Sequence, residues 1–145
     1  MSQFCHRHNL KLREKIFDKL KMLICSADIP GRAKIHPTVS FAHGGIGVII
    51  NPSSWIGEYC IINTKVTLGN AYPNDGAPKL GKYVYVGSGA FLGGNIEISD
   101  FVIIGANSVV VKSILEPGVI VAGVPARIIR KLSSSEMERM KKKRI

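Results

Sequence analysis

The sequence predicts an all-β fold, a parallel β-helix whose coils are built from six-residue repeats. Every sixth residue from position 50 to position 110 is aliphatic, with one exception inside a segment that we interpret as an inserted loop. The residue that follows is Gly or Asn in eight of the ten repeats outside that loop. A helix repeats every 3.6 residues and a strand every 2. A period of six therefore indicates short strands joined by turns, three of which close one coil of about 18 residues in a stack spaced at ~4.8 Å.

The aliphatic column is predicted to form the core, because a single coil cannot bury its apolar face without a neighbour. Its members are Ile50, Ile56, Ile62, Leu68, Leu80, Val86, Leu92, Ile98, Ile104 and Val110. Asn74 interrupts the column within NAYPNDGAPK, which predicts an inserted loop at 70–79. The fifth position of each repeat is mostly small or β-branched, so we expect it to point inward too. Cys60 occupies such a position and is expected to pack in the core rather than act as a nucleophile.

The Gly and Asn column that follows the aliphatic column predicts turns with positive φ. Its members are Asn51, Gly57, Asn63, Gly69, Gly81, Gly87, Gly93 and Gly105. Gly and Asn enter the left-handed region of backbone space most readily. We therefore expect a left-handed residue every six positions.

Three segments are predicted along the chain: a helical cap at 1–28, the β-helix at 29–126, and a basic tail with a short helix at 127–145. The first carries an apolar stripe of Leu12, Ile16, Leu20 and Leu23, which we expect to cover the open end of the β-helix. The step from Phe41 to Ile50 is nine residues instead of six. Three extra residues near His43 therefore predict a bulged coil, which is a natural place for a site.

The formal net charge is +10, and the segment 127–145 alone holds eight Lys or Arg and two Glu. Solvated basic helices are the simplest interpretation; a polyanionic ligand or an anionic membrane surface are the alternatives. No aromatic residues alternate with the basic ones, so nucleic-acid binding is not expected. The sequence shows no secretory signal, no apolar run of membrane-spanning length and no cysteine or histidine metal motif. We expect a cytoplasmic protein without a metal.

Several repeats, among them IGEYCI, LGKYVY, VGSGAF and IGANSV, resemble those of the bacterial hexapeptide acyltransferases. The ending AGVPARII resembles the C-terminal signature of that family. DIPGRAKIHPTVSFAH (28–43) is similar to the segment that opens the β-helix of the serine acetyltransferases. GVIINPSSWIGEYCIINTKVTLGN (47–70) is similar to those enzymes and to their relatives in surface-polysaccharide gene clusters. The resemblance implies a left-handed β-helix, although spacing alone does not set handedness and right-handed crossovers are the general rule.

The resemblance also implies a catalytic dyad of Asp28 and His43, which are fifteen residues apart as in the serine acetyltransferases. The chemistry is sound, because an alcohol is a poor nucleophile until a base removes its proton and neutral imidazole is suited to that near pH 7. A carboxylate on the other ring nitrogen would hold the tautomer and stabilise the imidazolium.

The co-substrate implied by the resemblance is acetyl-CoA, held along the β-helix between neighbouring subunits of a homotrimer. Small residues at turns would let the pantetheine approach the backbone, and basic residues would bind its phosphates. The candidate turn residues are Gly87, Ser88, Gly105 and Ala106, and the candidate cations are Lys112, Arg127, Arg130 and Lys131.

Departures from the serine acetyltransferase pattern bear on the acceptor. Those enzymes carry Asp immediately before the catalytic His, where this chain has Ala42, and an Arg-His pair in the loop, where it has Gly76 and Ala77. An acceptor's ammonium and carboxylate would lack those partners. We therefore expect an acetyl-CoA-dependent O-acetyltransferase acting on a sugar or polysaccharide hydroxyl, with serine acetylation and a non-enzymatic scaffold as alternatives. The candidate acceptor contacts are Trp55, Tyr72, Asn74 and Asp75.

Overall fold

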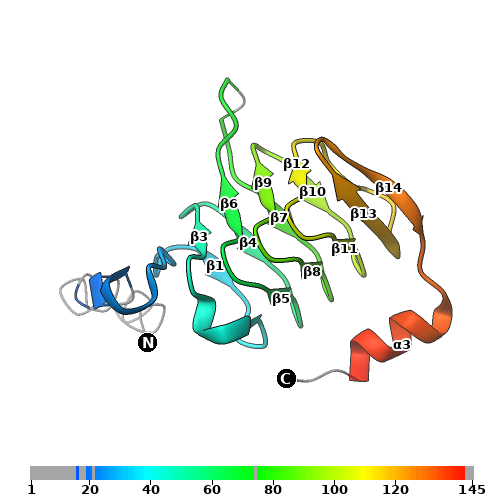
Figure 1. Cartoon of the computed structure of the whole chain (residues 1–145), viewed down its shortest axis with the longest axis horizontal. Coiled ribbons are helices and arrows are strands. Elements are labelled where there is room, and N and C mark those ends of the chain that lie inside the picture. The colour runs from blue at the N-terminus through cyan, green and yellow to red at the C-terminus, as the bar shows by residue number, and fades with distance from the viewer. Residues whose placement is uncertain (1–15, 17–18, 21, 74, 143–145) are drawn as a thin grey trace.

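The computed structural model describes residues 16, 19, 20, 22–73 and 75–142, and it confirms an all-β solenoid (Figure 1). Its strands form three sheets, which we call faces A, B and C. Face B consists of β1 (Lys34–Ile35), β4 (Trp55–Ile56), β7 (Lys79–Leu80) and β10 (Glu97–Ile98). Face C consists of β2 (Ser40–Phe41), β5 (Ile61–Ile62), β8 (Tyr85–Val86), β11 (Ile103–Ile104), β13 (Val119–Gly123) and β14 (Ala126–Lys131). Face A consists of β3 (Ile49–Ile50), β6 (Thr67–Gly69), β9 (Phe91–Gly93) and β12 (Val109–Val110).

Parallel pairing between successive coils brings the predicted aliphatic column into register. Ile56 pairs with Leu80 on face B, Ile62 with Val86 on face C, and so on through the stack. All ten aliphatic members of the column are at most 2% exposed. The fifth positions, Cys60 among them, are buried as well. The predicted inward positions are therefore confirmed.

The prediction that the Gly and Asn column supplies the residues with positive φ is wrong. Left-handed residues do occur in the turns, but two positions after the Gly or Asn column and in only two of every three turns, at Tyr59, Lys65, Tyr83, Gly89, Phe101 and Asn107. None of Gly57, Gly81 or Gly87 has a positive φ. A Cβ on Gly87 would instead lie 2.5 Å from the Ala106 nitrogen of the next coil. Glycine is required at these positions because stacked coils approach closely there, and not because the backbone needs a positive φ.

Turns at three corners join the faces, and we name each corner by the faces it connects, in chain order. Corner CA is formed by residues 42–48, 63–66, 87–90 and 105–108. Corner AB is formed by 51–54, 70–78, 94–96 and 111–113, and corner BC by 36–39, 57–60, 81–84, 99–102 and 115–118. The segment 70–78 is the longest connection and projects away from the coils (Figure 1).

The solenoid ends in a hairpin. β13 continues face C in parallel with β11, and β14 turns back antiparallel along β13, with Val119 opposite Lys131. The sequence analysis divided the β-helix from the basic tail between residues 126 and 127. In the structure β14 crosses that boundary, because its pairing with β13 continues to Lys131. A C-terminal helix, α3 (Ser134–Lys142), then returns beside corner BC, where Lys141 Nζ lies 5.7 Å from the centre of the Phe101 ring.

The described residues at the N-terminal end of the structure include a helical turn at 22–25. Leu12 of the predicted stripe lies outside the described residues. Ile16, Leu20 and Leu23 have exposed side chains, so the expected burial of the stripe against the β-helix is not found at these three positions. No helix in the described part of the chain has the length and apolarity needed to cross a membrane.

Candidate functional site

His43 lies where the sequence predicts a bulge. The first turn of corner CA has seven residues (42–48), whereas the next has four (63–66), so three extra residues are accommodated there. They form a short 3₁₀ element, η1 (Ala42–Gly45), in which His43 has φ 52° and Gly44 has φ 69°. The side chain of His43 is exposed. A non-glycine residue in the left-handed region is uncommon and marks a backbone conformation that its surroundings impose.

The base of this turn is held to neighbouring segments by backbone hydrogen bonds. Gly47 N–H donates to the Cys25 carbonyl over 3.0 Å, and Lys65 N–H donates to the Ile46 carbonyl over 2.9 Å. The His43 ring therefore projects from an anchored loop on the first complete coil.

Asp28 lies on face A beside the same turn. It forms an isolated parallel bridge with Ile49, in which its N–H donates to the Val48 carbonyl and its carbonyl accepts from Ile50 N–H, each over 2.8 Å. This pairing brings Asp28 alongside the strand that follows the His43 turn. No hydrogen bond joins the Asp28 carboxylate to the His43 ring in the described residues. The structure thus places the two residues in one region without making the dyad.

The four small residues predicted to bind the cofactor share corner CA with His43, on later coils. Gly87 N–H donates to the Ile104 carbonyl and Gly105 N–H to the Val121 carbonyl, each over 2.8 Å, so the two glycines follow one another up the stack. Ser88 and Ala106 are exposed at the outside of this corner. The result is a ridge of small residues that a ligand could approach closely.

The four predicted cations do not lie together. Arg130 makes a bidentate contact with Glu136, at 2.7 and 2.9 Å, and Lys131 pairs with Glu116 at 2.7 Å. These contacts raise the pKa of both basic groups. Arg127 lies on β14 opposite Ala122, next to corner CA, and the described residues provide it with no ion pair.

Lys112 lies at a different corner from the other cofactor candidates. It lines a polar hollow at corner AB, together with Asp75 and residues 93–96. Because corner AB and corner CA flank face A on opposite edges, Lys112 does not extend the ridge of small residues. It lies with a predicted acceptor contact instead.

The predicted acceptor contacts are also divided. Tyr72 is 95% exposed in the projecting segment, Asn74 lies outside the described residues, and Asp75 lines the hollow at corner AB. Trp55 is 56% exposed on face B, where it lines a separate hollow with Arg32 and Lys34. One chain therefore does not gather these residues around His43.

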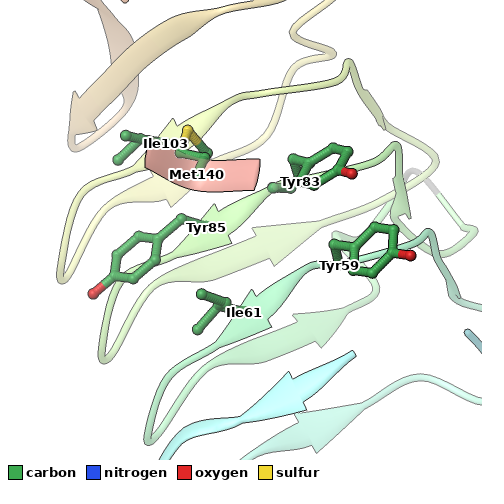
Figure 2. Close-up of a pocket in the computed structure, with 7 residues that line it drawn as sticks. Tyr59, Ile61, Tyr83, Tyr85, Ile103 and Met140 are labelled. Carbon is green, nitrogen blue, oxygen red and sulfur yellow. The ribbon is translucent and has the colours of Figure 1, made fainter. Parts of the chain in front are cut away.

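The sequence analysis missed an apolar hollow of about 260 Å³ on the outer surface of face C. Figure 2 shows Ile61, Tyr85 and Ile103 projecting from successive strands, with Met140 of α3 beside Ile103. Its border at corner BC is a ladder in which Tyr59 stacks on Tyr83 at 5.0 Å, and Tyr83 stacks in turn on Phe101 at 4.8 Å. An aromatic residue at the same repeat position in three coils was the available signal.

Cys60 is fully buried, and burial raises the pKa of its thiol to about 12. A thiol that remains protonated is a poor nucleophile. The expectation that Cys60 belongs to the core is therefore confirmed. No cluster of three His, Cys, Asp or Glu suited to a metal ion occurs among the described residues.

Comparisons with known proteins place this geometry in a family context. The chain is 32% identical over 131 residues to a serine acetyltransferase of Synechococcus elongatus, covering 89% of this chain and 53% of that protein. It is 37% identical over 118 residues to the serine acetyltransferase of Buchnera aphidicola subsp. Schizaphis graminum, covering 76% of this chain and 45% of that protein. The solved structure of a Brucella abortus serine acetyltransferase in complex with coenzyme A superposes with a TM-score of 0.83 at 28% identity, covering 91% of this chain and 53% of that one.

The chain has the left-handed β-helix fold of the hexapeptide-repeat acyltransferases. It spans about half the length of the serine acetyltransferases that it matches. No family model matches the chain. The left-handed β-helix that the resemblance implies is confirmed. The expected closeness to polysaccharide-modifying relatives is not supported, since the matches are serine acetyltransferases.

Proposed function

We propose that this chain is an acetyl-CoA-dependent O-acetyltransferase in which His43 acts as the general base, with serine as the preferred acceptor. The observation that carries the proposal is that His43 is exposed on a three-residue insertion. The fold that presents it is shared with serine acetyltransferases, two of whose solved structures contain coenzyme A. The similarity runs through the coil that presents this histidine, because the Synechococcus match covers 89% of the chain. Serine replaces the sugar hydroxyl that the sequence analysis favoured.

The proposed step needs one base and no covalent enzyme intermediate. His43 takes the proton of the acceptor hydroxyl as the oxygen bonds to the carbonyl carbon of the thioester. The carbon–sulfur bond then breaks, and the imidazolium returns the proton to the leaving thiolate of coenzyme A. We propose that Asp28 orients the imidazole, through a hydrogen bond that forms when the substrates bind, since such bonds are often long in unliganded enzymes.

The ridge at corner CA is proposed to hold acetyl-CoA. Gly87, Ser88, Gly105 and Ala106 lie on the same corner as His43, so a pantetheine arm along them would lead toward the base. Arg127 is the cation proposed to meet the phosphates, because Arg130 is already paired with a carboxylate. The same is true of Lys131, which pairs with Glu116.

A homotrimer is proposed from the contrast between the outer faces. The outward residues of faces A and C are mainly apolar: Ile49, Thr67, Phe91 and Val109 on face A, and Ile61, Tyr85, Ile103 and Ile120 on face C. Face B carries Lys34, Trp55, Lys79 and Glu97. Two apolar faces that flank corner CA would let each chain contact two neighbours and leave face B in water.

A second acceptor class, a neutral sugar hydroxyl, is favoured by one observation. The positions that carry charged loop residues in the serine acetyltransferases are Gly76 and Ala77 here, and Ala77 is 5% exposed. Neither residue can hold the charged ends of an amino acid.

The test is an acetyl-transfer assay on the purified chain. Coenzyme A release from acetyl-CoA is followed with a thiol reagent, with serine and a panel of sugars as acceptors. General-base catalysis of this type contributes about 10²–10⁴-fold, so His43→Ala should lower kcat/KM by that order. His36→Ala, on an exposed histidine at corner BC of the opening coil, is the matched control and should leave the rate unchanged. Undiminished turnover by His43→Ala would rule out the mechanism, and turnover of sugars but not serine would select the second acceptor class.

A further inference from the structure

Face B carries a row in which one aromatic residue lies between two basic residues. Parallel pairing sets Lys34 beside Trp55 and Trp55 beside Lys79, and all three are exposed on the outer side of the sheet. The three residues belong to successive coils, so the alternation of basic and aromatic side chains runs up the stack and is invisible along the sequence. The fold therefore creates a combination that the sequence analysis did not find.

The same row lines a hollow of about 650 Å³. Arg32 contributes from the turn before β1, and Pro52 and Ser53 contribute from corner AB. A volume of this size lies within the range of pockets that hold small molecules. None of the described residues that line the hollow is acidic, and half of them are basic.

Two of the three cations are free to meet a ligand. Arg32 and Lys34 make no side-chain hydrogen bond or ion pair with another described residue, whereas Lys79 contacts Glu97 at 3.4 Å. Three cations with one carboxylate at the edge leave the hollow positively charged, so it attracts anions.

The indole of Trp55 is uncovered as well. Its side chain is 56% exposed, and no ring or cation contact involves it among the described residues. The aromatic ladder at corner BC differs, because Tyr59, Tyr83 and Phe101 stack on one another. An open indole beside cations is a surface on which a flat ring can stack.

The backbone that carries these side chains is fixed to the solenoid. Trp55 N–H donates to the Pro78 carbonyl over 3.2 Å, and Lys34 N–H donates to the Ser54 carbonyl over 3.0 Å. The turn that carries Arg32 is closed by a backbone hydrogen bond of 3.1 Å. The binding groups are therefore held in place before a ligand arrives, which lowers the entropic cost of binding.

We propose that this hollow binds a nucleoside phosphate, with the base stacked on Trp55 and the phosphates on Arg32 and Lys34. Bases stack on aromatic side chains, and guanidinium and ammonium groups bind phosphate oxygens. One aromatic residue accommodates one base, whereas a nucleic-acid strand needs a platform for each successive base. A neutral ring would leave the cations without a counter-charge, and a planar lipid surface does not fill a hollow.

The inference goes beyond the proposed acetyl transfer. The hollow belongs to one chain and needs no second copy. It shares no residue with the His43 turn or with the ridge at corner CA. Face B also stays in water in the proposed trimer, so the hollow remains accessible there.

The test uses Trp55 as its own reporter, because it is the single tryptophan of the chain. ADP, adenosine and inorganic pyrophosphate are titrated into the purified chain without acetyl-CoA. ADP should quench tryptophan emission saturably and at lower concentration than the other two, because it alone offers both a base and phosphates. Arg32→Gln and Lys34→Gln should each weaken ADP binding by about 2- to 5-fold, as expected for exposed charges. Lys82→Gln, a charge removal at corner BC, should match wild type.

The stacking contact is tested by calorimetry, since Trp55→Leu removes the fluorescent reporter. Loss of a base–aromatic stack predicts ADP binding that is about 5- to 100-fold weaker, with pyrophosphate binding unchanged. Trp55→Phe keeps an aromatic ring and should retain most of the affinity for ADP. Equal ADP affinity in Trp55→Leu and wild type would refute the stack.

Other outcomes would overturn the inference and leave acetyl transfer untouched, because no acetyl donor is present. Pyrophosphate that binds as tightly as ADP would show a plain anion site. Loss of ADP binding in Arg127→Gln, with Arg32→Gln unchanged, would place the nucleotide on the proposed acetyl-CoA ridge. A blue shift of Trp55 emission with phosphatidylserine vesicles, without a response to ADP, would show a membrane-binding surface. An absence of saturable quenching by ADP up to millimolar concentration would also refute the site.

Discussion

Replacing Gly57 by alanine tests whether the glycine column exists for close stacking of coils. A Cβ at Gly57 would lie 2.8 Å from the Gly81 carbonyl carbon and 3.0 Å from the Leu80 oxygen. Carbon atoms prefer separations of about 3.5–4.0 Å, so the coils would have to part by roughly 0.7–1.2 Å. That movement strains the 2.9 Å hydrogen bond from Gly57 N–H to the Leu80 carbonyl. Overpacking of this kind costs about 1–3 kcal/mol.

Gly69→Ala is the matched control from the same column. Its Cβ would meet Thr67 Cγ2 at 3.5 Å and Phe91 Cε2 at 3.6 Å, which is ordinary contact, and its φ is not positive. Alanine there should stabilise the chain by about 0.4–1 kcal/mol, because it restricts the unfolded state. Thermal unfolding at one fixed protein concentration measures both, at about 2–4 °C per kcal/mol. The stacking explanation fails if Gly57→Ala melts at or above wild type, or if the two variants shift equally.

Two further predictions follow from the pKa shifts. The pKa of Cys60 is about 12, so only about one molecule in ten thousand carries the thiolate at pH 8. Iodoacetamide should therefore label Cys60 only after the chain is unfolded in guanidinium, as measured by mass spectrometry. Rapid labelling of the folded chain would contradict the burial of Cys60. The Arg130 guanidinium and Ser133 N–H lower the pKa of Glu136 from 4.5 to about 2. The stabilisation of α3 by Glu136 is therefore complete above pH 4.5 and lost as the pH falls toward 2. The sulfur of Met137 faces Gly118, so the NMR signal of its methyl group should shift as the pH falls from 4.5 toward 2. The signal should not shift in Glu136→Gln. The same titration in that variant would refute the link between Glu136 and the position of α3.

The fold was predictable because the residue types at the first and fifth positions of each repeat show which side chains point inward. Residues similar to Ile56 and Cys60 occur every six positions, a period that neither an α-helix nor a single β-strand has. What the sequence could not distinguish was why Gly57 is glycine. A small residue serves equally well for a left-handed backbone or for a close neighbour, and only the carbonyl of Gly81 above it decides the matter. The left-handed position itself is occupied by Tyr59, whose type gives no hint of its φ of 58°.

The candidate site was predictable where chain length alone determines it. A step of nine residues from Phe41 to Ile50 requires a larger turn, and the turn carries His43. The cations were less predictable, because an ion pair depends on residues that the fold brings from elsewhere. Glu136 reaches Arg130 by way of the helix cap, in which Ser133 N–H donates to its carboxylate over 2.8 Å. The position of Lys112 at corner AB follows from its distance past Val110, which counting within the repeat could have revealed.

The terminal hairpin has a consequence for the limits of the assembly. A stack of parallel coils presents bare strand edges at its ends, and such edges invite another molecule to add on and build a fibre. Here β14 covers the last edge of face C with an antiparallel strand that carries Arg127, Arg130 and Lys131. A growing filament would need an uncharged parallel edge at that place. β14 therefore blocks the addition of another chain at this end of face C, so the proposed trimer would have to form through the sides of the solenoid.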